Sequence, residues 1–209
     1  MKKWYHILWA LLAVACSKGE SAPPQESADQ ETAYTAIVTQ KRDAQMQVYF
    51  QLDDNTIIYP VNFTDAFSGM RRLICGITVD GSSCYIHWMD YLAEAQFVAS
   101  ASIPDDGIDV QDDWMTSVED GYLTVHYFSW WGDGSTPHSL QVVQGEHPYE
   151  LNLRHSRNGD DAYEWADGLV YFDINSLPST QGDYVTLTLN WTTGEGKAAS
   201  KRFRFRTRQ

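Results

Sequence analysis

Four tryptophans in the C-terminal half have the residue type and setting to bind a ligand by stacking: they are Trp114, Trp130, Trp131 and Trp165. Trp130 and Trp131 directly precede a glycine-rich turn at residues 132–135. Neighbouring residues of a strand point to opposite faces, so one of these two indoles can lie in a core while the other is exposed. Exposed aromatic rings on a β-scaffold can stack on sugar rings. The sequence favours indoles that fill a sandwich core or cover its loop end, with glycan stacking as the alternative.

Basic residues alternate along the end of the chain, at Arg202, Arg204, Arg206 and Arg208. Residues 197–208 carry six bases and no acid, whereas residues 105–183 carry 16 acids and two bases. We expect this basic strand to lie in one sheet with acidic neighbours, where it reduces repulsion across the strands. The alternative is that the four arginines form a face for an anionic partner, such as a polysaccharide or a lipid A phosphate.

Histidines and paired carboxylates are the other residue types that could do chemistry or bind a metal. The histidines that follow the N-terminal segment are His87, His126, His138, His147 and His155. None lies at zinc-ligand spacing from another histidine or from a cysteine, and we expect His126 to be hydrogen-bonded to its strand neighbours. The acid pairs at 105–106, 112–113 and 160–161 lack the calcium-loop repeat. A glycosidase carboxylate pair has only the abundance of acids behind it. We therefore expect no catalytic residue, no metal and no cofactor.

Cys75 and Cys84 flank a turn at residues 80–83. If that turn closes a tight hairpin, Val79 pairs with Cys84 and Cys75 pairs with Trp88. The two sulfurs are then several residues out of register, whereas a disulfide needs Cα atoms within about 7 Å. We therefore expect two free, partly buried thiols, even in an oxidising compartment.

The N-terminus has the layout of a bacterial lipoprotein signal. Lys2 and Lys3 precede an apolar run at residues 4–14, which ends in small residues and Cys16. The run is shorter than the ~20 residues of a spanning helix. We expect cleavage of residues 1–15 and lipidation of Cys16, which becomes the new N-terminus. An ordinary signal peptide with a chance cysteine is the alternative.

Processing changes the charge of the chain. Cleavage removes two lysines and no acid, which takes the formal net charge from −13 to −15. Residues 16–33 then form a lipidated, flexible tether rich in Ser, Ala, Pro, Gln and Glu. This arrangement predicts a domain anchored at the bacterial cell envelope, in the outer membrane, on either its periplasmic or its outer side.

The remaining residues are expected to form strands, because their dominant period is two. Leu187 and Leu189 alternate with threonines, and the alternation of Met46, Val48 and Phe50 is of the same kind. Only residues 88–98 hint at a helix. We therefore predict an all-β protein, with turns marked by Asp, Asn and Gly.

Two domains fit the spacing of these strands. Residues 34–102 offer about five short strands, as in a small OB-like barrel, and residues 103–209 offer about seven, as in an antiparallel β-sandwich. The 43% hydrophobic composition excludes a disordered chain. The acidic balance argues against a nucleic-acid-binding protein, which needs clustered Lys and Arg.

Three segments carry a resemblance to a known family. Residues 121–127 (GYLTVHY), 138–143 (HSLQVV) and 150–156 (ELNLRHS) are similar to the C-terminal β-sandwich of the NigD-like lipoproteins of Bacteroidetes. Residues 159–160 and 168–173 (GLVYFD) extend the likeness. The N-terminal half resembles the family's OB-like domain, and the lipoprotein signal matches too. The resemblance implies a bacteriocin-associated or immunity-related role, and it supplies no catalytic residues.

Two functions follow as expectations. The first is a lipid-anchored, non-enzymatic envelope protein that binds a protein or another macromolecular partner. The second is a cell-surface glycan-binding lipoprotein that uses exposed tryptophans.

Overall fold

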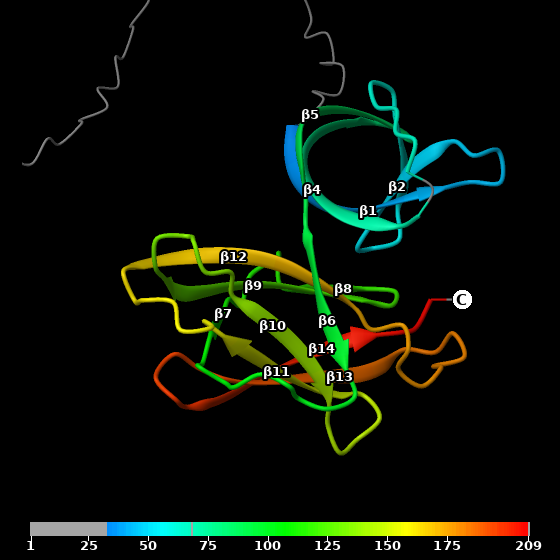
Figure 1. Cartoon of the computed structure of the whole chain (residues 1–209). Coiled ribbons are helices and arrows are strands. Elements are labelled where there is room, and N and C mark those ends of the chain that lie inside the picture. The colour runs from blue at the N-terminus through cyan, green and yellow to red at the C-terminus, as the bar shows by residue number, and fades with distance from the viewer. Residues whose placement is uncertain (1–32, 68, 209) are drawn as a thin grey trace, which may run out of the picture. The chain divides into compact units, whose positions relative to one another are not determined.

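The structure, a computed structural model, describes residues 33–67 and 69–208, and its regular elements are all strands (Figure 1). This confirms the all-β fold class. Five strands close into a barrel, and nine form one curled sheet. The predicted signal peptide, Cys16 and the tether up to residue 32 lie outside the described residues.

The barrel strands are β1 (Ala33–Arg42), β2 (Val48–Leu52), β3 (Ile57–Pro60), β4 (Arg71–Asp80) and β5 (Ser83–Tyr91). They close in the order β1-β2-β3-β5-β4, and β3 and β5 run parallel. Alternate residues point inward and form the barrel core, because each strand has one buried face. This core includes Val38, Phe50, Ile58, Leu73 and Ile77.

β2 begins two residues later than the period-two pattern indicates. Val48 and Phe50 are buried as expected, but Met46 is 58% exposed and has a φ of 65°. The Asp43 carboxylate accepts hydrogen bonds from the backbone N–H groups of Gln45 and Gln47, both at 2.9 Å. These bonds stabilise a turn at Met46, so the prediction of an inward-facing Met46 was wrong.

The β4–β5 hairpin holds the two cysteines apart. Val79 pairs with Cys84 as predicted, but Cys75 pairs with Met89 rather than with Trp88. The register shifts between Gly76 and Ile77, because β5 has one unpaired residue between Ile86 and Trp88. This extra residue moves the pairing of Cys75 by one position. Cys75 and Cys84 are both buried and free, which confirms the predicted thiols.

The curled sheet contains the remaining nine strands, whose bounds are as follows: β6 (Ala93–Val98), β7 (Asp109–Val110), β8 (Ser117–Glu119), β9 (Tyr122–Trp131), β10 (Ser139–Gln144), β11 (Glu150–Ser156), β12 (Glu164–Asp173), β13 (Val185–Thr192) and β14 (Ala198–Phe205). Its order is β14-β13-β11-β10-β6-β12-β9-β7, with β8 paired to β9. Inward-facing residues such as Leu123, Val125 and Phe172 form its core.

Three pairings in this sheet are parallel, where an antiparallel sandwich of about seven strands was expected. β6 runs parallel to both β10 and β12, and β11 runs parallel to β13. β6 follows the barrel directly and enters the middle of the sheet, so its two partners come from much later in the chain. The weak helical hint at residues 88–98 falls on β5 and β6. β6 lies within residues 34–102, the predicted first domain, but it pairs with strands of the second. The division into two domains at residue 102 stays a prediction.

Candidate functional site

Strand alternation separates the two adjacent tryptophans of β9. Trp130 is 46% exposed, whereas Trp131 packs against the core of the curled sheet. The Trp131 indole N–H donates to the carbonyl oxygen of Ala166 at 3.2 Å, and its ring stacks on His138 with centroids 3.9 Å apart. Trp130 and Trp131 are therefore not exposed together, and Trp131 does not join a surface with the other tryptophans.

Trp130 instead forms an exposed aromatic surface with Trp165 and Phe128, which we call the aromatic ladder. Trp130 and Trp165 are paired across β9 and β12, and their rings meet edge to face at 5.3 Å. Trp165 also stacks on Phe128, with centroids 6.0 Å apart and planes 18° from parallel. Trp165 is 40% exposed. The ladder thus presents ring edges and faces to solvent in a fixed arrangement.

A histidine held by two carboxylates adjoins the ladder. His126 lies two residues before Phe128 on the same face of β9, with their rings 5.8 Å apart. Its Nδ1 lies 2.6 Å from Asp113 Oδ2, and its Nε2 lies 3.3 Å from Asp167 Oδ2. The Asp167 side chain is 64% exposed, so this cluster offers carboxylate acceptors beside the rings.

The Asp113 carboxylate is favoured in its charged form. Burial acts to raise its pKa, but the hydrogen bond and the charge of His126 act against burial. Backbone N–H groups of Met115 and Thr116 also donate to it, and together these contacts lower the pKa of Asp113. Trp114 follows Asp113 in the chain and is 53% exposed. Within the described residues no ring contact joins Trp114 to the ladder.

The C-terminal arginines alternate as predicted, since Phe205 and Thr207 are buried between them. Arg206 pairs with Asp120 at 2.6 Å, and Arg208 pairs with Asp173 at 2.7 Å. Arg204 lies over the Tyr184 ring at 3.4 Å, and Arg202 is exposed.

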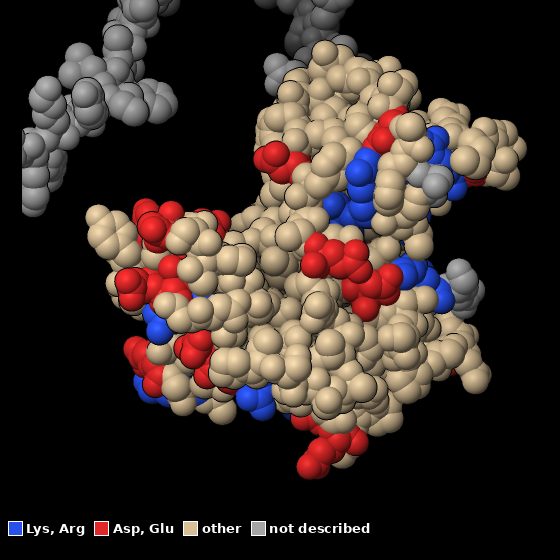
Figure 2. Space-filling view, viewed as in Figure 1, with Lys and Arg blue, Asp and Glu red and all other residues tan. Residues whose placement is uncertain are grey.

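Acids thus neutralise half of this proposed anionic-partner face. In the view of Figure 2 the basic side chains lie in small groups, most of them next to acidic ones. This arrangement favours the expectation that the basic strand relieves repulsion from acidic neighbours. A role for Arg202 and Arg204 toward an anionic partner stays a prediction.

A buried chain of two histidines and one carboxylate was not foreseen. His155 Nδ1 donates to the carbonyl oxygen of Gly107 at 2.8 Å, and its Nε2 lies 3.0 Å from His138 Nδ1. His138 Nε2 lies 3.2 Å from Asp160 Oδ2. Burial lowers the pKa of His155. Only the folding of distant segments brings these residues together, and no local spacing signals them.

The part of the chain that the structure describes contains no group of three His, Cys, Asp or Glu residues placed to hold a metal ion. Nor does a helix within residues 33–67 and 69–208 have the length and hydropathy to cross a membrane.

Comparison with known proteins decides the family. The model of the NigD-like C-terminal beta sandwich domain matches residues 92–205, which is more than half of the chain and runs from just before β6 to the end of β14. The chain belongs to the NigD-like family. This match confirms the resemblance seen in the sequence. No curated protein matches the chain.

Solved structures show the same fold. A "Putative TOXIN related protein" from Parabacteroides distasonis is 23% identical, with a TM-score of 0.69 over 83% of this chain and 94% of its own. A NigD-like immunity protein from Bacteroides caccae is 16% identical, with a TM-score of 0.57 over 80% and 91%. A "Putative lipoprotein" from Bacteroides fragilis is 11% identical, with a TM-score of 0.52 over 85% and 99%. At these identities the likeness concerns the fold.

Proposed function

We propose that this NigD-like protein is a lipid-anchored protein of the bacterial cell envelope that binds a protein partner and performs no catalysis. The observation that carries the binding role is the exposed pair Trp130 and Trp165. Large aromatic residues dominate the energy of protein interfaces, because they bury much apolar area at little entropic cost. An exposed pair in fixed contact is therefore a suitable anchor for a partner.

The chemistry around the ladder indicates the charge of that partner. Asp113 and Asp167 lie beside it. Asp109 of the neighbouring strand β7 pairs with Phe128 of β9. Acidic residues around an aromatic centre favour a basic surface and speed its encounter by electrostatic steering. We therefore propose a partner with a cationic patch around an apolar pocket.

Relatives support an immunity-related role at the envelope. The Bacteroides caccae structure is of an immunity protein, and the Parabacteroides distasonis protein is described as toxin-related. The Bacteroides fragilis relative is described as a "Putative lipoprotein", in agreement with the lipoprotein signal expected before Cys16. We propose that Cys16 carries the lipid and that the partner is a toxin-related or envelope protein.

The binding role is tested by capture of envelope proteins on the detergent-solubilised chain. A specific protein retained by the wild type and lost in both Trp130→Ala and Trp165→Ala supports the proposal. Tyr85→Ala is the matched control, because Tyr85 is an exposed aromatic residue of the barrel. A partner retained equally by all variants places binding elsewhere and contradicts the role of the ladder.

The anchor is tested separately with Cys16→Ala. We expect this variant to lose incorporation of a labelled fatty acid. A variant that still takes up the label and still sediments with membranes shows that Cys16 is not the lipidation site.

A second candidate function is glycan binding by the same ladder. Its support is the edge-to-face pair of indoles with carboxylate acceptors next to it. Sugar rings stack on aromatic rings, and sugar hydroxyl groups donate hydrogen bonds to carboxylates. A glycan array separates the two functions. Saturable sugar binding that is lost in Trp165→Ala favours the glycan, whereas a captured protein without sugar binding favours the protein partner.

A further inference from the structure

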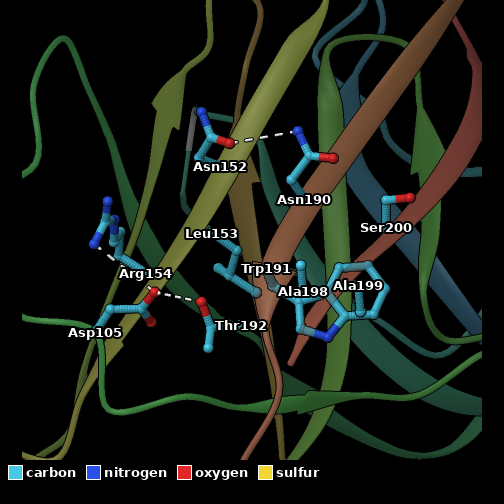
Figure 3. A pocket seen from close by; sticks show the side chains of 10 residues that line it. All are labelled: Asp105, Asn152, Leu153, Arg154, Asn190, Trp191, Thr192, Ala198, Ala199 and Ser200. Carbon is cyan, nitrogen blue, oxygen red and sulfur yellow. Dashed lines mark hydrogen bonds and ion pairs between the residues drawn. The ribbon is translucent and has the colours of Figure 1, made fainter. Parts of the chain in front are cut away.

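A polar groove on the outer face of the curled sheet is separate from the aromatic ladder. It spans β11, β13 and β14 and has a volume of about 490 Å³, which is within the range of small-molecule sites (Figure 3). Asn152 pairs with Asn190, and Asn190 pairs with Ser200, so these three residues form one row across three strands. Directly paired residues of neighbouring strands share a face.

The sizes of the side chains explain why the surface is hollow here. Leu151 and Leu153 of β11 and Leu189 of β13 are buried in the core, so the intervening Asn152 and Asn190 face outward. On β14 the groove is lined by Ala198, Ala199 and Ser200, whose side chains are small. The long Arg202 side chain follows on the same face, outside the groove lining.

One end of the groove is formed by a charged pair and a hydroxyl group. Asp105 Oδ2 accepts a hydrogen bond from the Thr192 hydroxyl at 2.9 Å and lies 3.8 Å from Arg154 Nη1 (Figure 3). The opposite charges of Asp105 and Arg154 largely cancel. A neutral ligand is therefore favoured over an anion at this end of the groove.

Polar side chains that face the groove keep unused hydrogen-bonding atoms. Asn190 uses its amide N–H groups on Glu150 Oε1 at 2.8 Å and Asn152 Oδ1 at 3.4 Å, which leaves its own carbonyl oxygen as an acceptor. Ser200 adds a hydroxyl group.

We propose that this groove binds one ring of a neutral sugar. The lining offers donors and acceptors in close alternation, and a sugar hydroxyl both donates and accepts, so neighbouring hydroxyl groups can pair with each in turn. Leu153, Trp191 and Ala199 lie at strand positions whose side chains face the core, so Ala198 is the apolar side chain among the lining residues that lies on the groove face. A helical or strand-like peptide would instead need apolar anchor pockets or an open sheet edge.

The proposal is tested by calorimetric titration of the full chain with glucose, galactose, mannose and N-acetylglucosamine, each alone. The detergent must lack a sugar headgroup. Ser200→Trp places a large ring in the groove at an exposed strand position. Arg202→Trp is the matched control, since it places the same ring two residues along the same face, outside the groove.

We expect saturable binding of at least one sugar, weakened about tenfold or more in Ser200→Trp and unchanged in Arg202→Trp. Asp105→Asn, which preserves the shape, is expected to weaken the same sugar. The absence of saturable binding for all four sugars overturns the proposal. So does binding that survives Ser200→Trp but is lost in Trp165→Ala, because it places the sugar on the ladder.

Discussion

Arg72 of the barrel and Glu119 of the curled sheet form an ion pair whose two side chains are fully buried. Arg72 Nη1 donates to Glu119 Oε2, while Arg72 Nε donates to the Thr124 hydroxyl at 2.9 Å. Arg72 Nη2 also donates to Asp53 Oδ1 at 2.6 Å. Burial raises the pKa of Glu119, and the charge of Arg72 opposes that shift. The buried Arg72 guanidinium thus joins the barrel to the sheet, and its charge is compensated by its hydrogen-bonded partners.

This relationship predicts a large effect of removing one partner. Glu119→Ala removes one of the two carboxylates that pair with the buried Arg72 guanidinium and leaves Asp53 as the other, so we expect a loss of about 3 kcal/mol of unfolding free energy, at the low end of the range for a broken buried pair. The double variant Arg72→Met with Glu119→Leu removes both charges and is expected to lose much less. Urea denaturation compares these two variants with the wild type. Equal losses in the single and double variants would show that lost packing, rather than an unpaired charge, is responsible.

The buried histidine chain predicts loss of stability in mild acid. Burial, helped by the charge of His138, lowers the pKa of His155 below its ordinary 6.5, while the Gly107 carbonyl and Asp106 act in the opposite direction. Between the folded and the unfolded pKa the unfolded chain binds more protons, so stability falls as the pH drops below about 6.5. Above that pH the contribution of His155 is fully present.

Unfolding free energies measured between about pH 7 and pH 5 check this sign. His155→Asn is expected to be less stable throughout but to depend less steeply on pH in that window. His147→Asn is the matched control, because His147 is exposed. An equally steep dependence in His155→Asn would assign the acid sensitivity to other groups.

Alternation in the sequence was sufficient wherever one face of a strand meets a core. It placed Leu187 and Leu189 inside and separated Trp130 from Trp131, because the strand period is set by local geometry. It was wrong at Met46, where the Asp43 carboxylate stabilises a turn. It was also wrong at Cys75, where one extra residue near Gly76 shifts the register.

The remaining features depend on contacts between distant residues. β6 lies between β10 and β12, which follow it by more than forty residues in the sequence. Arg72 and Glu119 look like ordinary surface charges in the sequence, since nothing nearby signals their burial. The aromatic ladder was half predicted: the exposed tryptophan of β9 was expected as an alternative, but its pairing with Trp165 required the β9–β12 register.

The two cysteines are predicted to react slowly in the folded protein. Burial raises the pKa of the Cys75 thiol to about 12 and that of Cys84 to about 11, so almost none of either is thiolate at neutral pH. A thiol reagent added to the native chain carrying Cys16→Ala should therefore react with neither on the timescale of an exposed cysteine. Denaturation without reductant should release two reactive thiols. Recovery of none would mean that the two are bonded.

At Gly168 we predict that even one added methyl group is too large for the space available. It pairs with Tyr127 across β12 and β9, and a Cβ atom there would lie 2.5 Å from Tyr127 Cζ. Tyr127 is buried beside Trp131 and His155, so its ring has little room to move. Gly168→Ala is expected to cost about 1–3 kcal/mol through overpacking.

Urea denaturation of Gly168→Ala measures that cost. Thr186→Ala, on an exposed strand position, should change stability by no more than about 0.5 kcal/mol and serves as the control. Because Trp131 belongs to the same packed group, near-ultraviolet circular dichroism should also change in Gly168→Ala and not in Thr186→Ala. A Gly168→Ala variant as stable as the wild type would show that the Tyr127 ring shifts freely, which its burial between Trp131 and His155 argues against.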